Sequence, residues 1–274
     1  MARSTKFKIY YALFSVLVVV GFYIWENYID QQKFLQNAEP YAVPGQDQDS
    51  LLLPHSTTRN VVYHKHYTLS YHETYEQSEW VAYRLDKSHI VRTQRKRPFF
   101  EMDPGVSTQS AHWKNYKKSG YDRGHLCPAG DRRFSEAAYT ETFLTSNCSP
   151  QLHGFNSGIW NFLEQQARRW AQQYGSVYVI TGGVLTPGLD TIGEERVAVP
   201  NYYYKILYRQ QNGTSVPLAF LFPHREASAE LELSNYLTTV DQIEQLTGID
   251  FFPLFADSDE AIFEAKGYAK DWEW

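Results

Sequence analysis

The sequence predicts an α+β fold, with a central, mainly antiparallel sheet that is flanked by helices. Three observations favour this class. Strand-like runs outnumber helical patterns, the pair Asn212-Gly213 lies between two of these runs as in a tight hairpin, and one long helical pattern interrupts their succession. We find no internal repeat in the 274 residues.

Five segments have the composition and alternation of strands. Residues 79–85 place successive side chains on opposite faces, as expected for a strand with two neighbours. Residues 177–181 (VYVIT) form a continuous apolar run, which is typical of a buried central strand. The predicted strands are 61–69, 79–85, 177–181, 202–208 and 216–222.

Two helices are predicted. Residues 157–174 carry apolar side chains at helical spacing, and Gly175 follows as a stop signal. The second helix covers residues 239–247, where a threonine opens the segment as a cap and Gly248 ends it.

Composition excludes several classes of protein. Hydrophobic residues make up 43% of the chain and charged residues 21%, which is ordinary for a folded domain, and two cysteines are too few for a disulfide scaffold. The net charge of −5 is unevenly distributed. Residues 92–133 hold ten Lys or Arg against four acids, whereas residues 226–274 hold twelve acids against two lysines. The first segment is a candidate anion-binding surface and the second a solvated acidic face.

The N-terminal part predicts a membrane anchor. Residues 1–8 are a basic flank, and residues 9–25 are uncharged and apolar, so that as a helix they would span roughly 26 Å. We favour an uncleaved signal anchor with the rest of the chain outside the cytoplasm, periplasmic or extracellular. Cleavage of this segment would instead give a secreted protein. Residues 26–59 are predicted to be a tether, 60–255 the folded domain and 256–274 an acidic tail.

The run Asp122-Arg123-Gly124-His125 concentrates reactive groups. Histidine is the side chain best suited to accept a proton near neutral pH. In an extended strand Arg123 would lie on the same side as His125, within reach of a phosphate oxygen. Gly124 would allow a ligand to approach the backbone closely. The alternative is a surface strand with a solvated histidine.

Four further polar residues follow downstream. Asn147 and Asn156 each have a structural alternative as turn or cap residues, and Asn156 is placed to cap the helix at 157–174. Glu164 and Arg168 are four residues apart, the spacing of an exposed ion pair on a helix. Each of these signals is weak alone, so their joint occurrence is what needs an explanation.

Together these motifs resemble the DNA/RNA non-specific endonucleases of the ββα-metal (His-Me finger) superfamily. The resemblance rests on Asp122-Arg123-Gly124-His125, on Asn147-x-x-Pro150-Gln151, and on Asn156-x-x-x-Trp160 followed by Leu163-Glu164 and Arg168. It extends over residues 60–255. Several linked motifs in the right order are far more specific than any one of them.

The resemblance implies a role for each residue. His125 would be the general base that takes a proton from the attacking water, and Asn156 the one protein ligand of a Mg²⁺ ion, for which Mn²⁺ could substitute. Glu164 and Asn147 would hold metal-bound waters or neighbouring loops. Asp122 would brace the motif rather than react.

The resemblance also implies the substrate contacts. Arg123, Arg168 and Arg97 would bind phosphates of DNA or RNA, and hydrolysis would leave 5′-phosphate and 3′-hydroxyl ends. Binding through the backbone rather than the bases predicts little sequence preference and an affinity that falls with salt.

Two features lie outside this pattern. Cys127 and Cys148 each lie next to a motif residue, and the sequence leaves open a disulfide or two buried thiols. His64, Lys65 and His66 are interpreted as the exposed surface of a strand.

Two other functions stay open at this point. The chain could be a non-catalytic module that captures nucleic acid with its basic surface. It could also be an anchored interaction protein that works through its acidic C-terminal segment.

Overall fold

The computed structural model describes residues 10–11, 13–22, 24–25, 28–29, 53–211, 214–226, 232–253 and 269–273. The chain divides into two compact units, Met1–Glu39 and Pro40–Trp274, and everything below concerns the second unit unless the first is named. The predicted boundaries of the tether and the acidic tail stay predictions, since most of both segments lies outside the described residues.

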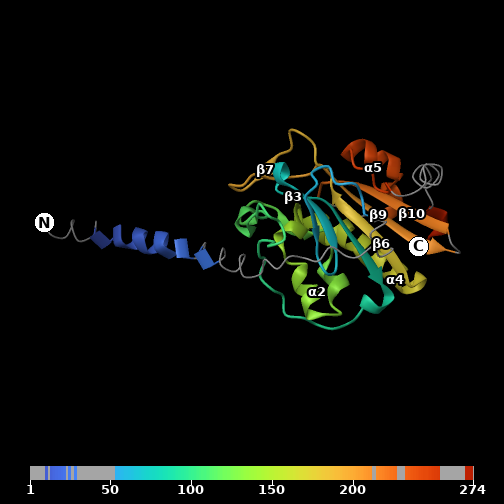
Figure 1. The fold of residues 1–274 in the computed structure, drawn as a ribbon, viewed down its shortest axis with the longest axis horizontal. Coiled ribbons are helices and arrows are strands. Elements are labelled where there is room, and N and C mark those ends of the chain that lie inside the picture. Colours follow the sequence, from blue (N-terminus) through green and yellow to red (C-terminus); the bar gives the residue numbers. More distant parts are fainter. Residues whose placement is uncertain are drawn as a thin grey trace. The chain divides into compact units, whose positions relative to one another are not determined.

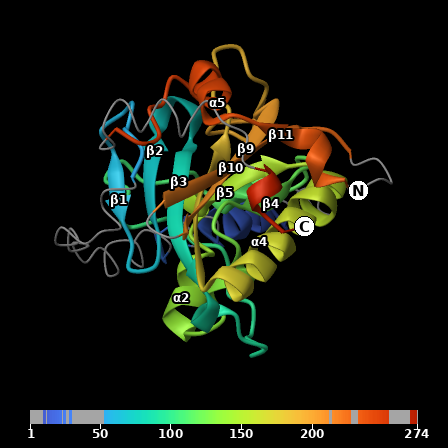
Figure 2. The ribbon, with the colours of Figure 1, turned by 90° about the vertical axis from the view of Figure 1, so that its right-hand side faces the viewer.

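A seven-stranded sheet runs through the second unit, and every neighbouring pair in it is antiparallel (Figure 2). The strand order is β1-β2-β3-β6-β9-β10-β11. Its strands are β1 (Val61–Tyr63), β2 (Thr68–His72), β3 (Gln77–Asp86), β6 (Ser176–Gly183), β9 (Tyr202–Gln211), β10 (Thr214–Pro223) and β11 (Leu237–Thr238). The predicted α+β class with a mainly antiparallel sheet is therefore confirmed. The predicted strand at 61–69 is two strands, because the chain turns between Tyr63 and Thr68.

Two short ribbons lie outside this sheet. One pairs β4 (Asp122–His125) with β5 (Cys148–Gln151), and the other pairs β7 (Thr191–Ile192) with β8 (Val197–Ala198). The β4–β5 ribbon carries the histidine motif. The Asn-Gly pair of the predicted hairpin is outside the described residues, but β9 and β10 pair in the register of a two-residue turn, with Gln211 opposite Thr214.

Helices are few and short apart from α4. They are α2 (Glu136–Glu141), α3 (His153–Phe155), α4 (Asn161–Tyr174) and α5 (Val240–Thr247), with a π-helical turn η7 (Asn156–Trp160) before α4. Single 3-10 turns are η2 (Glu73–Tyr75), η3 (Lys87–His89), η4 (Trp113–Tyr116), η5 (Ala129–Arg132), η6 (Thr145–Asn147), η8 (Leu233–Tyr236) and η9 (Ala269–Asp271). The predicted caps are present, since the Thr239 hydroxyl accepts from Gln242 N at the start of α5, and Gly175 and Gly248 end α4 and α5.

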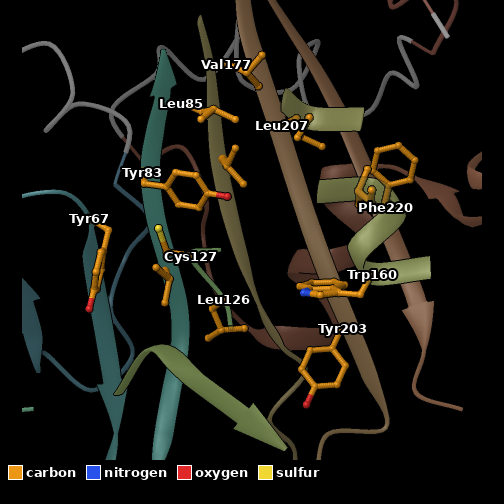
Figure 3. Close-up of a cluster of buried hydrophobic side chains, with 14 of the residues drawn as sticks. Tyr67, Tyr83, Leu85, Leu126, Cys127, Trp160, Val177, Tyr203, Leu207 and Phe220 are labelled. Atoms are coloured by element: carbon orange, nitrogen blue, oxygen red, sulfur yellow. The ribbon is translucent and has the colours of Figure 1, made fainter. Parts of the chain in front are cut away.

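The alternation of the strands divides the core into two layers. On one face, Tyr83, Leu85 and Leu207 pack with side chains of α4, as the close-up in Figure 3 shows for part of this cluster. On the other face, neighbouring residues such as Ala82 and Ile206 pack against α5 and the segment after it. Figure 1 shows α4 and α5 on the two sides of the sheet. Period-two alternation in β3 and β9 thus builds both layers.

The predicted transmembrane anchor is wrong. Within the part of the chain that the structure describes, no helix has the length and apolar character to cross a membrane. The physical reason is length, because a spanning helix needs about 20 residues. The uncharged run at 9–25 has 17 residues, and the helical residues described within it are 10–11, 13–22 and 24–25. The membrane contact predicted for this segment is therefore not supported either.

The end of the chain makes contacts that the solvated tail did not predict. Trp272 is 2% exposed and packs edge-on against Trp170 of α4, with ring centroids 4.9 Å apart. The Trp170 indole donates to Glu273 O at 2.6 Å. Trp272 therefore belongs to the core of the folded domain.

Candidate active site

The β4–β5 ribbon brings two predicted motifs together. Its register pairs Asp122 with Gln151 and His125 with Cys148, so the histidine motif lies beside the Asn147-x-x-Pro150-Gln151 motif. Residues more than twenty positions apart in the sequence thus become cross-strand neighbours. The ribbon therefore brings the two motifs to one place in the fold.

Gly124 allows a close approach, but the group that approaches is not a ligand. A Cβ atom at this position would lie 2.1 Å from Gln151 Oε1. Gln151 is fully buried, so its side chain occupies the space that the missing Cβ leaves. The glycine is needed for packing within the ribbon.

The η7 turn places Asn156 against the same ribbon. Asn156 Nδ2 donates to Asp122 Oδ2 at 3.0 Å, at one end of β4, and the Trp160 indole donates to His125 O at 3.3 Å, at the other end. The histidine strand and the asparagine turn are thereby tied together at two points, which is a ββα arrangement. Asn156 does not cap the long helix, because α3 and η7 continue the chain in helical form around it.

His125 packs against two aromatic rings that also contact each other. Its ring centroid is 5.5 Å from that of Phe100 and 5.1 Å from that of Phe143. Burial, reinforced by the charges of Arg97 and Arg123, lowers the pKa of His125 to about 4. The imidazole is consequently neutral at pH 7, as a proton acceptor must be. Its Nε2 has no hydrogen-bond partner among the described residues.

The two arginines stack around the same pair of rings. Arg123 Cζ lies 4.7 Å from the centroid of Phe100, and Arg97 Cζ lies 5.6 Å from Phe100 and 5.7 Å from Phe143. Within the described part of the chain, Arg123 Nε has no hydrogen-bond partner. Two cations therefore lie beside the neutral imidazole, where they can meet an anionic substrate.

Asn147 has a local role. It is fully buried, its Oδ1 accepts from Cys127 N at 2.7 Å, and its Nδ2 donates to Cys127 O at 2.9 Å and Thr142 O at 3.0 Å. Both ends of the amide are engaged by backbone. Asn147 thus fixes the chain just after His125, which agrees with the part of its predicted role that concerns loops.

Glu164 is half-buried, and Lys205 is the opposite charge near it. Burial raises the pKa of Glu164 to about 7, while the charge of Lys205 opposes that rise. Lys205 is 1% exposed, and its Nζ is 4.3 Å from the centre of the Trp160 ring. Lys205 thus links electrostatically to Glu164 and packs on Trp160, whose indole donates to the histidine strand.

Arg168 forms its ion pair with Asp131 and not with Glu164, as the i,i+4 alternative would require. Arg168 Nη1 lies 2.6 Å from Asp131 Oδ1, and the Tyr83 hydroxyl donates to the other oxygen of Asp131 at 3.1 Å. Asp131 is 1% exposed and Arg168 keeps 20% of its side chain exposed. Asp131 therefore holds the guanidinium of Arg168 from the buried side, and part of the Arg168 side chain stays open to solvent.

The side chains present suit a hard, hydrated cation. Because Asn156 donates to Asp122 through Nδ2, its amide oxygen faces away from that carboxylate. In the described ranges there is no group of three or more His, Cys, Asp or Glu that could hold a metal. A cation bound here must keep most of its waters, which is how Mg²⁺ binds.

The two features left over from the sequence are also settled. Cys127 and Cys148 are both buried and free, so the disulfide alternative is wrong and the buried-thiol alternative is confirmed. His64 is buried as well, with its Nε2 2.8 Å from Asp103 Oδ2, so its interpretation as exposed surface is wrong. The loop at 103 covers this histidine, and the sequence gives no sign of that contact.

A comparison with known families agrees with this geometry. The model of the DNA/RNA non-specific endonucleases matches residues 49–258. The chain belongs to this family. It is therefore a nuclease, and membership implies a divalent metal and a nucleic-acid substrate.

Individual relatives support the family assignment. Mitochondrial nuclease EXOG of Danio rerio is 32% identical over 265 residues, which are 88% of this chain and 76% of the relative. Human mitochondrial EXOG is 34% identical over 68% of this chain and 55% of its own length, and human mitochondrial endonuclease G is 30% identical over 68% and 67%. A chain in the crystal structure of the EndoG/EndoGI complex superimposes with a TM-score of 0.68 at 28% identity, over 80% of this chain and 91% of that one.

These relatives correct the predicted location. The extracytoplasmic, membrane-anchored placement depended on the anchor, for which no suitable helix is described, and the similar proteins are named as mitochondrial nucleases. That prediction is wrong.

Sequence reasoning missed four residues that shape this site. Phe100 and Phe143 hold the imidazole and two arginines, Asp131 holds Arg168, and Lys205 lies beside Trp160. For Lys205 a signal existed, since a lysine inside the otherwise apolar run YYYKILY is unusual for a central strand.

Proposed function

We propose that this nuclease is a Mg²⁺-dependent endonuclease that cleaves DNA and RNA without sequence preference and leaves 5′-phosphate and 3′-hydroxyl ends. The observation that carries the proposal is the double tie between the strand of His125 and the turn of Asn156. It supports an arrangement in which a base and a metal ligand act on one phosphodiester.

His125 is the general base in this proposal. A neutral imidazole can take the proton of a water molecule as that water attacks phosphorus, and burial keeps this imidazole neutral. Asn147 supports it indirectly by holding the backbone of Cys127, two residues after His125. His125 would be catalytic, whereas Asn147 would be a positioning residue.

Asn156 holds the metal ion in this proposal, through its amide oxygen. A bound Mg²⁺ ion would stabilise negative charge on the phosphate and on the leaving oxygen. Asp122 fixes the amide by accepting from Nδ2, and Glu164 would orient waters around the ion, with Mn²⁺ as a substitute.

Arg97, Arg123 and Arg168 are the proposed phosphate ligands. Guanidinium groups form charge-assisted hydrogen bonds with phosphate oxygens, and these strengthen as charge develops during hydrolysis. Because such contacts read the backbone and not the bases, cleavage should show little sequence preference, and affinity should fall with salt.

The decisive experiment compares His125→Ala with His55→Ala, a control at an exposed histidine. We expect His125→Ala to lose most hydrolysis of supercoiled DNA and of RNA while it keeps DNA affinity, and the control to behave as the parent protein. Near-full activity of His125→Ala, in a preparation free of other nucleases, would refute the role of the base.

A second experiment addresses the metal. Asn156→Ala should raise the magnesium concentration needed for half-maximal cleavage or abolish turnover, while Asn161→Ala, one turn further along, should not. An unchanged magnesium dependence of Asn156→Ala would exclude this amide as the ligand.

A further inference from the structure

A cavity lies away from the residues assigned to catalysis. It has a volume of about 410 Å³ and opens between the β1–β2 connection, the end of β3 and the η5 turn. None of the histidine, arginine and asparagine side chains proposed for catalysis lines it. Its volume falls in the usual range for small-molecule sites, roughly 300 to 1,000 Å³.

The cavity arises from the way β2 leaves β3. The ladder between them ends at Thr68 opposite Ala82, whereas β3 continues to Asp86 (Figure 2). Arg132 enters at this point from η5, and its Nη2 donates to His66 O at 2.9 Å and to Arg84 O at 3.2 Å. The guanidinium is thus built into the wall of the cavity.

One side of the cavity is lined by cationic groups and imidazoles. Lys65, Arg84 and Arg132 line it against a single carboxylate, Asp86, which already pairs with Arg84 Nε at 2.9 Å. His66 and His89 line it as well. An anion is the ligand that such a wall would attract.

Two side chains in the wall of the cavity have buried nitrogen atoms without a hydrogen-bond partner among the described residues. Arg132 is 1% exposed, and in the described ranges its Nε and the Nε2 of His66 have no hydrogen-bond partner. Burial, and then the charges of Arg132, Lys65 and His89, lower the pKa of His66 to about 4. Four side chains that can carry positive charge therefore lie close together here: His66, Arg132, Lys65 and His89.

Much of the rest of the lining is aromatic or aliphatic. Tyr178 and Tyr208 stack with centroids 5.0 Å apart, and with Tyr63 and Phe252 they form an apolar side of the cavity. A ligand that satisfies both sides must combine an anion with a planar, largely apolar body.

We propose that this cavity binds a nucleoside monophosphate, with the phosphate at Lys65, His66 and Arg132 and the base on the aromatic side. The ligand chemistry is shared by mononucleotides released from nucleic acid and by free nucleotides of the cell. The inference does not depend on the catalytic roles above, since it uses none of those residues.

The test is isothermal titration calorimetry of the full chain in EDTA with 5′-AMP, 5′-dAMP, 3′-AMP, adenosine and inorganic phosphate. We expect one site for the nucleotides and affinities at least tenfold lower for adenosine and for phosphate alone. A preference for 5′-dAMP over 5′-AMP would identify DNA fragments as the source, and equal binding would identify the mixed nucleotide pool. Equal affinities for phosphate and the nucleotides would overturn the nucleotide assignment.

Variants separate this cavity from the catalytic centre. Lys65→Ala combined with His66→Phe should weaken 5′-AMP binding roughly tenfold or more, because each removes a charged or polar phosphate contact. Lys87→Ala combined with His55→Phe makes the same changes at exposed positions outside the cavity and should bind normally, as should Arg123→Ala. If the double variant does not fold, Lys65→Ala alone carries the test, because that side chain is exposed. Unchanged binding in the cavity variants, or loss of binding in Arg123→Ala, would refute the proposal.

Discussion

Replacement of Gly124 by alanine tests how the catalytic ribbon is built. In the structure the new Cβ atom would lie 2.1 Å from Oε1, 2.2 Å from Cδ and 2.5 Å from Cγ of Gln151. Carbon contacts this short do not occur, so either the Gln151 side chain or strand β4 must move. Gln151 is fully buried, which leaves its side chain little room to turn away.

Overpacking of the interior determines how much stability Gly124→Ala loses. Inserting one methyl group into a filled interior typically lowers the free energy of unfolding by about 1–3 kcal/mol. For a domain of this size that corresponds to a fall in melting temperature of about 2–4 °C per kcal/mol. Both polar atoms of the Gln151 amide lack a partner among the described residues, so Gln151→Ala sacrifices no hydrogen bond to them. It creates space that the alanine at 124 can use.

The assay is a double-mutant cycle by urea denaturation. We expect Gly124→Ala to be destabilised by the amount above, and Gly124→Ala/Gln151→Ala to be as stable as Gln151→Ala to within about 0.5 kcal/mol. Turnover should follow the same order, since a displacement of His125 by 1 Å can cost about a hundredfold in rate. Additive free energies in the cycle would show that the two side chains do not compete for space and would refute the reasoning.

Three other predictions concern separate parts of the domain. Asp131→Asn should lower the free energy of unfolding by roughly 3 kcal/mol in urea, because it leaves the Arg168 cation without its buried partner, and a change below 1 kcal/mol would contradict this. Phe99, near Arg97 in the sequence, is 91% exposed and offers a surface on which a base can stack. Phe99→Ala should therefore weaken the binding of single-stranded DNA by about 1–3 kcal/mol in a titration and leave the stability of the protein unchanged. Equal affinities of the variant and the parent protein would exclude such stacking. Burial raises the pKa of the Cys127 and Cys148 thiols to about 12. Ellman's reagent at pH 8 should therefore detect neither thiol in the native protein and both thiols in urea. Detection of fewer than two thiols in urea would contradict the finding that both are free.

Much of the fold was accessible from the sequence because it depends on local patterns. Alternation of side chains in residues 79–85 and 202–208 predicted strands, and these strands now form the two layers of the core. The end of the long helix at Gly175 was also local information. Its beginning was not, because the turn at 156–160 is π-helical and Gly158 departs from helical geometry, with φ −94° and ψ −111°.

The candidate active site also has a part that the sequence could predict and a part that it could not. Sequence order was enough to indicate His125, Asn156 and their neighbours, since the motifs carry the reactive groups themselves. It could not indicate what holds them. Phe100 precedes His125 by 25 residues and Phe143 follows it by 18, and neither has a pattern that distinguishes it from the other phenylalanines of the chain. Contacts of that kind depend on the tertiary packing of irregular loops, for which the sequence has no periodic signal.

Lys205 is an example of a tertiary neighbour that influences a residue proposed for catalysis, Glu164. A lysine in the centre of a sheet costs free energy to bury unless an opposite charge compensates it, and here Glu164 supplies that charge. The same pairing works in the other direction, because the ammonium favours the ionised form of a carboxyl that burial alone would keep protonated. Each member of the pair therefore opposes the effect of burial on the other, although burial still raises the pKa of Glu164 to about 7 and lowers the pKa of Lys205. The carboxylate that the family motif identifies depends on a cation from a strand outside the motif, so the motif alone does not define the electrostatics of the site.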